Sequence, residues 1–282
     1  MSLMWFKKNP AVGGRWSGKN HLICLVMVAL DLNYKELGQG HPIVILHGLF
    51  GTLDNWQTIA KYLSTEYSVY LVDLRNHGRS PHLPDMNYGL MAEDVRQFME
   101  SHWLHEAYVM GHSMGGKVAM QLALNNPDMV EKLIVVDIAP KTYTGSHFEI
   151  FKALLSLDLA QTNDRAIAEA HLYQFEKDPG VVQFLMKNLS RKKEGGFEWK
   201  MNLPVIYEHY ADILANVSGD HPFEHPTLFI RGELSGHVKD SDLPEIRRLF
   251  PAVVLETIPQ AGHWVHADQP AALLERVRAF LG

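Results

Sequence analysis

The stretch VMGHSMGG, residues 109–116, holds Ser113 between two glycines in the spacing G-x-S-x-G. The apolar run before it, residues 107–110, indicates a strand, and the apolar residues 118–124 after it indicate a buried helix. In this context the spacing predicts a sharp strand-to-helix turn that projects the hydroxyl from the top of a sheet. The flanking glycines suit a turn too tight for side chains. We therefore predict that Ser113 is a nucleophile; a plain turn is the alternative.

Other apolar runs along the chain alternate with helical patterns. The strand candidates are short: residues 42–46, 69–72, 132–136, 227–230 and 253–258. The first of them is a continuous apolar run, which suits a strand buried on both faces of a parallel sheet. The alternation predicts an α/β fold, with a mostly parallel sheet flanked by helices. Ligands of such sheets bind beyond the carboxyl ends of the strands. We expect the functional site there, because His47, Ser113, Asp137 and His263 each follow a strand candidate.

The pattern changes between residues 141 and 220, where apolar residues recur at helical spacing without a strand-like run. We expect a helical cap there, inserted into a core formed by residues 27–140 and 221–282. Its apolar side chains suit an acyl chain, although a small helical unit needs the same residues for its own core. The expected substrate-binding residues are Phe148, Phe151, Phe184, Leu185 and Trp264.

Residues 1–26 show no periodicity and are expected to be an extension, with Met27 as a candidate natural start. Basic residues followed by the apolar run 22–30 resemble a signal peptide, but no clean cleavage site follows. Alternation in residues 31–34 instead indicates a first strand. We therefore expect a cytoplasmic protein. The sequence has no apolar run of about 18 residues, the length that a membrane-spanning helix needs.

Composition narrows the function classes. The 282 residues carry a formal net charge of −6 and no basic stripe, which argues against nucleic-acid binding. A single cysteine excludes an internal disulfide and a thiolate metal site. The 16 histidines form no H-E-x-x-H pattern, so we expect neither a metal nor a cofactor. Composition does not indicate the oligomeric state.

A serine hydroxyl needs a base within hydrogen-bond reach, and that base needs a carboxylate to orient it. In this chain order the base is expected after the last strand, where His263 lies, with His266 packing elsewhere. The usual acid follows the strand at 227–230 as G-x-x-D, but here Ser235 occupies that position. We prefer Asp137, at the end of the preceding strand. Glu233, Asp240 and Asp242 remain alternatives.

The chemistry also needs hydrogen-bond donors for an oxyanion. The backbone N–H of Met114 is expected to be one, because it opens the helix after the nucleophile. The second is expected from Leu49 or Phe50, in the glycine-punctuated loop HGLFG, residues 47–51. We expect His47 itself to be a buried structural residue.

From Met27 to Gly282 the chain resembles the α/β-hydrolase superfamily, and within it the YbfF-type esterases of bacteria and their mitochondrial relatives. The resemblance rests on HGLFG (47–51), DLRNHGRS (73–80), GHSMGG (111–116), VDIAP (136–140), FEWKMNL (197–203) and AGHWVH (261–266). It implies cofactor-free hydrolysis of carboxylic esters or acyl thioesters. In that group the acid after the later strand is often missing, and the aspartate of VDIAP takes its role.

The leading hypothesis is therefore a serine carboxylesterase or thioesterase acting on a small-molecule ester with a short to medium acyl chain. Other serine chemistries of the fold remain open, namely C–C bond hydrolysis, acyl transfer and perhydrolysis. A different class is a slow-turnover relative that senses a ligand. Dehalogenases and epoxide hydrolases are disfavoured, because they use an aspartate where Ser113 stands.

Overall fold

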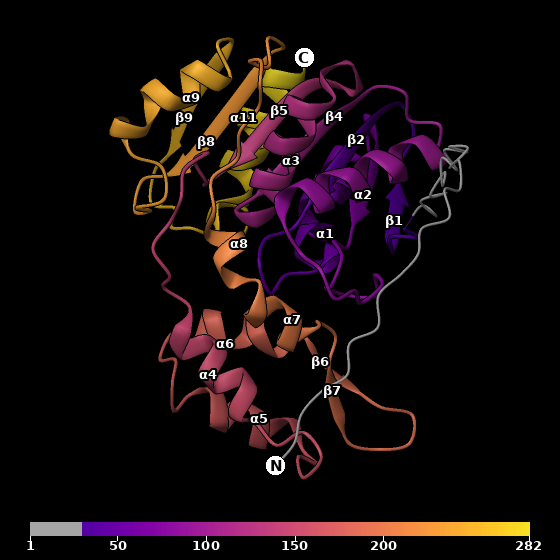
Figure 1. Ribbon diagram of the computed structural model, residues 1–282, viewed down its shortest axis with the longest axis vertical. Coiled ribbons are helices and arrows are strands. Elements are labelled where there is room, and N and C mark those ends of the chain that lie inside the picture. The colour runs from indigo at the N-terminus through magenta and orange to yellow at the C-terminus, as the bar shows by residue number, and fades with distance from the viewer. Residues whose placement is uncertain (1–29) are drawn as a thin grey trace, which may run out of the picture.

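The computed structural model describes residues 30–282, so the expected extension, residues 1–26, and the candidate start at Met27 lie outside the described residues. A seven-stranded sheet forms the centre (Figure 1). Its strands are β1 (Tyr34–Leu37), β2 (His41–Leu46), β3 (Tyr67–Val72), β4 (Ala107–His112), β5 (Val130–Val136), β8 (Thr227–Gly232) and β9 (Val253–Ile258). Their order is β1-β3-β2-β4-β5-β8-β9, and within this sheet only β1 pairs antiparallel. The predicted α/β class with a mostly parallel sheet is confirmed.

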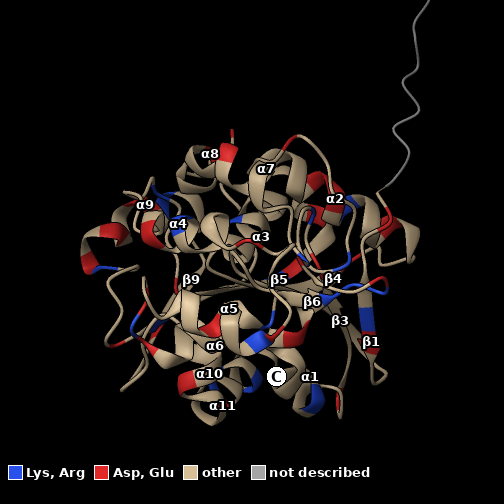
Figure 2. Ribbon diagram, turned by 90° about the horizontal axis from the view of Figure 1, so that it is seen from below, with Lys and Arg blue, Asp and Glu red and all other residues tan. Residues whose placement is uncertain are grey.

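Helices cover both faces of this sheet (Figure 2). One face carries α2 (Tyr88–Ser101), α3 (Met114–Asn125) and α9 (Leu243–Leu249), and the other carries α1 (Gln57–Leu63) and α11 (Pro270–Leu281). Side chains of β2 alternate between the two layers: Val44 and Leu46 pack on the first, Ile43 and Ile45 on the second. Because both faces are covered, the strand sequence is continuously apolar.

Shorter elements complete the core: the 3-10 turns η1 (Leu53–Trp56), η2 (Pro127–Met129) and η3 (Asp240–Asp242), and the helix α10 (Val265–Asp268). Figure 2 shows acidic and basic residues interspersed over the described elements rather than gathered by sign. Within residues 30–282, none of the helices has the length and apolar character required to traverse a bilayer.

The segment between β5 and β8 forms a separate layer at one end of the sheet (Figure 1). Its helices are α4 (Phe148–Ser156), α5 (Arg165–Leu172), α6 (Pro179–Met186), α7 (Leu203–Glu208) and α8 (Tyr210–Leu214). The prediction that no strand interrupts it is wrong, because β6 (Leu189–Arg191) and β7 (Phe197–Trp199) pair as a hairpin. Gly195 and Gly196, with φ of 102° and 75°, allow the chain to reverse there. We refer to residues 141–220 as the cap.

The turn from β4 into α3 is built on close backbone approach. A Cβ on Gly111 would lie 2.1 Å from the carbonyl oxygen of Gly115, and one on Gly115 would lie 2.4 Å from that of His47. Neither glycine has a positive φ, so it is lack of space and not backbone conformation that requires glycine. This packing brings the residue-47 loop against the start of α3, at the carboxyl ends of the strands.

Candidate active site

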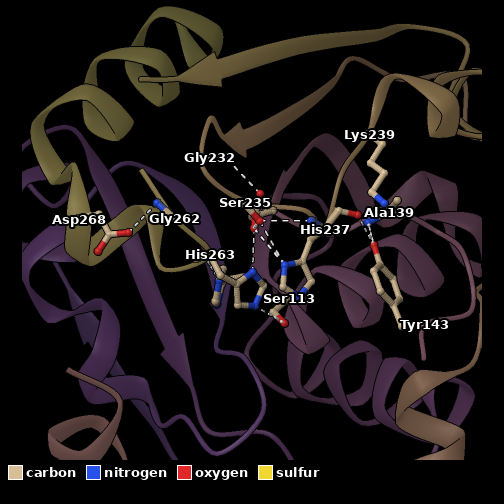
Figure 3. Close-up of polar contacts among 12 residues, drawn as sticks. Ser113, Ala139, Tyr143, Gly232, Ser235, His237, Lys239, Gly262, His263 and Asp268 are labelled. Carbon is tan, nitrogen blue, oxygen red and sulfur yellow. Dashed lines mark hydrogen bonds and ion pairs between the residues drawn. The ribbon is translucent and has the colours of Figure 1, made fainter. Parts of the chain in front are cut away.

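Three residues predicted from the sequence meet beyond the carboxyl ends of the strands. Figure 3 shows two of them, Ser113 and His263, side by side. Ser113 Oγ lies 3.0 Å from His263 Nε2, and Asp137 Oδ2 lies 2.7 Å from His263 Nδ1. The carboxylate accepts from Nδ1–H, which leaves Nε2 as an acceptor for the serine hydroxyl. The geometry is therefore that of a nucleophile, a base and an orienting acid.

Ser113 occupies a left-handed backbone conformation, with φ 53° and ψ −120°, between β4 and α3. Its N–H donates to the carbonyl of Val136 at 3.0 Å, which ties the turn to the end of β5. A serine pays a conformational penalty in this region, and such residues are held there only by the surrounding structure. The fold thus keeps the hydroxyl at the edge of the sheet facing the cap.

Asp137 is fully buried and also left-handed, with φ 51°. Its Oδ1 accepts from the N–H of Gly232 at 3.0 Å, and its Oδ2 accepts from the Ser235 hydroxyl as well as from His263. Burial raises the pKa of Asp137, while the hydrogen bonds from Ser235 and Gly232 act to lower it. Ser235, which occupies the position expected for an acid, thus contacts the acid instead.

The alternative acids lie elsewhere. Glu233 accepts from the N–H of Gln260 at 2.9 Å, Asp240 pairs with Arg231, and Asp242 pairs with Lys141. Among residues 30–282, Asp137 is the carboxylate that forms a hydrogen bond with His263. Glu233 does not contact His263, because it lies in the loop after β8 and its side chain turns toward residue 260.

His263 is surrounded by other histidines that the sequence did not single out. His237 stacks on it, with ring centroids 3.7 Å apart and an interplanar angle of 19°, and His112 Nε2 lies 2.8 Å from the His263 carbonyl oxygen. Burial lowers the pKa of His263 to about 3 and that of His237 to about 4. His263 is therefore neutral at physiological pH, the form that accepts a proton from serine. His266 stacks on Trp56 and does not contact Ser113 by any hydrogen bond within residues 30–282.

Side-chain ligand atoms of Asp137, His237 and His263 lie within 4.8 Å of one another, a spacing that a metal ion could use. The same atoms are engaged in hydrogen bonds, since Asp137 Oδ2 accepts from both His263 and Ser235. His237 Nδ1 lies 3.1 Å from Ser235 Oγ. These three residues are therefore linked to one another and to Ser235 by hydrogen bonds. That the site holds no metal stays a prediction.

The residues expected to form the oxyanion hole surround Ser113. Met114 is the first residue of α3, so its N–H has no intrahelical acceptor. Leu49 and Phe50 line the cavity beside Ser113, and Phe50 is held at φ 58° while its carbonyl accepts from Asn188 Nδ2 at 2.6 Å. The cap residue Asn188 therefore contacts the loop that holds Leu49 and Phe50.

Two cavities open on Ser113. The larger, of about 180 Å³, is lined by Phe184, Leu185 and Trp264, as expected, and by Trp56 and Glu176, which were not. The smaller, of about 60 Å³, is lined by Tyr88, Lys117, Tyr143 and Tyr210 among others. The five residues common to both walls are Leu49, Ser113, Ser146, His147 and His237.

Phe148 and Phe151 line neither cavity. Phe148 is 58% exposed on α4, and Phe151 is 1% exposed in the interior of the cap, packed against Phe50 and Tyr210. Phe151 therefore helps to form the cap's own core, which was the alternative to contact with an acyl chain. Sequence spacing identified an apolar helix but not which of its faces the fold would turn toward Ser113.

The sequence profile of the family described as alpha/beta hydrolase fold matches residues 41–270. The chain is 38% identical to the esterase YbfF of Escherichia coli over 241 residues, which cover 85% of this chain and 92% of that protein. It is 41% identical to the sn-1-specific diacylglycerol lipase ABHD11 of Mus musculus over 247 residues, covering 85% and 80% of the two chains. A solved marine microorganism esterase shares 43% identity and superposes with a TM-score of 0.87, covering 89% of this chain and 99% of that one.

Proposed function

The chain belongs to the α/β-hydrolase fold family, and from this premise we propose that it is a serine hydrolase that cleaves carboxylic esters through an acyl-enzyme intermediate. The observation that carries the proposal is the hydrogen-bonded series from Ser113 through His263 to the buried Asp137. The names of the similar proteins, an esterase and a lipase, support ester cleavage as the reaction.

In the proposed first half-reaction, Ser113 Oγ attacks the ester carbonyl carbon while His263 Nε2 takes its proton. Asp137 stabilises the resulting imidazolium, and the N–H groups of Met114 and of Leu49 or Phe50 hold the oxyanion. His263 then gives the proton to the leaving alcohol, or to the thiol of a thioester. In the second half-reaction water, activated by the same histidine, releases the carboxylic acid.

The cavity supports a substrate with a short to medium acyl chain. Its apolar wall, formed by Phe184, Leu185 and Trp264, is bounded on one side by the cap. A cavity of about 180 Å³ that is partly covered by the cap favours soluble esters over emulsified triglycerides. Acyl transfer and perhydrolysis would use the same intermediate with a different acceptor. The cytoplasmic location stays a prediction.

The proposal is tested by labelling and turnover together. A fluorophosphonate probe is expected to add its mass to the peptide that contains Ser113, and Ser113→Ala is expected to remove both labelling and hydrolysis of p-nitrophenyl butyrate. Hydrolysis by the alanine variant near the parental rate would overturn the mechanism. Running the assay with added alcohols or peroxide measures transfer in place of hydrolysis.

A further inference from the structure

His147 is a cap side chain that reaches the point where the two cavities meet at Ser113. It immediately precedes α4, and its ring packs edge-on to Phe50, with centroids 6.0 Å apart. It lines both the larger and the smaller cavity, as Ser113 and Leu49 do. A substrate whose carbonyl carbon contacts Ser113 places its ester group at this junction, with its two arms free to enter the two cavities.

The hydrogen bonds of Tyr210 determine which nitrogen of His147 carries the proton. The Tyr210 hydroxyl lies 3.2 Å from the backbone N–H groups of Ser146 and His147, and 2.7 Å from His147 Nδ1. A hydroxyl has two acceptor lone pairs and one hydrogen to donate. The two N–H groups occupy the lone pairs, so the hydroxyl hydrogen is donated to Nδ1, which must then be unprotonated.

With Nδ1 as an acceptor, the neutral ring carries its hydrogen on Nε2. Burial lowers the pKa of His147, so this neutral form is the one present at physiological pH, and burial raises the pKa of Tyr210, so the phenol keeps its donor hydrogen. Across residues 30–282, Nε2 has no hydrogen-bond partner, whereas Nδ1 has Tyr210. The described part of the fold therefore leaves the Nε2–H of His147 free, on a side chain that lines both cavities.

We propose that the Nε2–H of His147 donates a hydrogen bond to an oxygen of the scissile ester, and that Tyr210 acts as the positioning residue that enforces this tautomer. The inference rests on the proposed esterase function. It adds a substrate contact from the cap to the donors supplied by the core. His147 thereby adds a cap residue to the groups around the reacting carbonyl.

The test compares three substitutions by steady-state kinetics on p-nitrophenyl butyrate. His147→Phe keeps a ring but removes the donor, and kcat is expected to fall about 10-fold or more, since a lost donor at a developing charge has cost ~10²–10³ in other enzymes. His147→Gln retains an amide N–H in a similar place and is expected to recover much of that loss. Tyr210→Phe keeps His147 but frees its tautomer, so an intermediate loss is expected.

A matched control is the cap histidine His209, whose two nitrogens contact Asp212 and the Pro84 carbonyl oxygen away from both cavities. His209→Gln is expected to leave kcat and KM unchanged. Long-range ¹H–¹⁵N spectra report the tautomer directly: His147 is expected as Nε2–H in the parent and as a mixture in Tyr210→Phe. A structural role alone would not change that spectrum.

A butyryl ester and the matching thioester show which oxygen of the scissile ester accepts the hydrogen bond from His147. A loss confined to the ester indicates the alcohol oxygen, whereas an equal loss in both indicates the carbonyl oxygen. Parental kcat in His147→Phe, or equal losses in the Phe and Gln variants, would overturn the proposal. The proposed function fails separately, only if Ser113→Ala remains active.

Discussion

The carboxylate of Asp137 has no exposed surface, and it receives hydrogen bonds from a histidine, a hydroxyl and a backbone N–H. A buried carboxylate without such donors would be protonated rather than ionised. Its proposed role, to orient His263 and to stabilise the imidazolium, therefore depends on the groups around it.

Asp137→Asn is expected to fold and to lose about 10⁴-fold in kcat, because an amide favours the wrong tautomer of His263 and cannot stabilise its cation. Glu233→Gln serves as the control, since Glu233 contacts the Gln260 backbone and not the imidazole. Stopped-flow or steady-state turnover with p-nitrophenyl butyrate measures both. A larger loss in Glu233→Gln than in Asp137→Asn would show that Glu233, and not Asp137, is the acid that orients His263.

Ser235→Ala is expected to shift the acid side of the kcat/KM profile to higher pH. The hydroxyl opposes the effect of burial on the pKa of Asp137, so its removal raises that pKa. Activity requires the ionised carboxylate and neutral His263, and both are lost by protonation as the pH falls. The alanine variant therefore loses activity at a higher pH than the parent, with a similar plateau at pH 8. An unchanged acid limb would rule out this role.

The position of a single residue could be predicted from the sequence where the residue follows the end of a strand. Ser113, His263 and Asp137 each follow a strand end, and parallel strands bring such ends to one edge. His147 and His237 could not be identified in this way, because their relation to Ser113 depends on how the cap and the loop after β8 fold back. The one signal available was Ser235 in place of an acid, which marked the loop that also carries His237.

At the scale of elements, the junction of β4 and α3 permits little change. Gly115→Ala is expected to destabilise the fold by about 3 kcal/mol or more, because the added Cβ would meet the backbone oxygens of His47 and Leu46 at 2.4 and 2.5 Å. Gly116→Ala is the matched comparison and is expected to cost less, because its Cβ meets a side-chain atom, Ile138 Cγ2, at 2.7 Å and its nearest backbone oxygen, that of Gly111, only at 3.1 Å. Urea unfolding measures both. Equal stability of the two variants would contradict the packing argument.

The elements of the core were predictable because six strands are short, mainly apolar runs and the helices between them have clear spacing. Two elements differed from expectation. The first strand is Tyr34–Leu37 and not residues 31–34, since its pairing with β3 begins only at Tyr34. The cap hairpin has only three residues in each strand, too few for alternation to be visible in the sequence.

At the scale of the whole molecule, the cap and the core close the larger cavity together through Phe184 of α6 and Trp264, whose ring centroids are 5.5 Å apart. Phe184→Ala is expected to move the preferred p-nitrophenyl ester toward longer acyl chains, because the cavity is enlarged on the cap side. Phe148→Ala, which changes an exposed phenylalanine of the same layer, is expected to leave the preference as it was. Rates across a series from acetate to palmitate measure both.

An unchanged chain-length profile in Phe184→Ala would contradict the assignment of the acyl chain to the larger cavity. Faster hydrolysis of emulsified long-chain triglyceride than of soluble esters by the parent would contradict it as well. The sequence alone placed Phe148 and Phe151 at this site, but neither lines the cavity. Which face of a cap helix points inward is decided by long-range packing, here of Phe151 against Phe50 and Tyr207.

Three residues at the site, Phe50, Ser113 and Asp137, share left-handed backbone conformations that cost of order 1–3 kcal/mol each. Natural selection for heat resistance and selection for turnover therefore act in opposite directions at these positions. Glycine at residue 113 would relieve one of these penalties and remove the nucleophile in the same step.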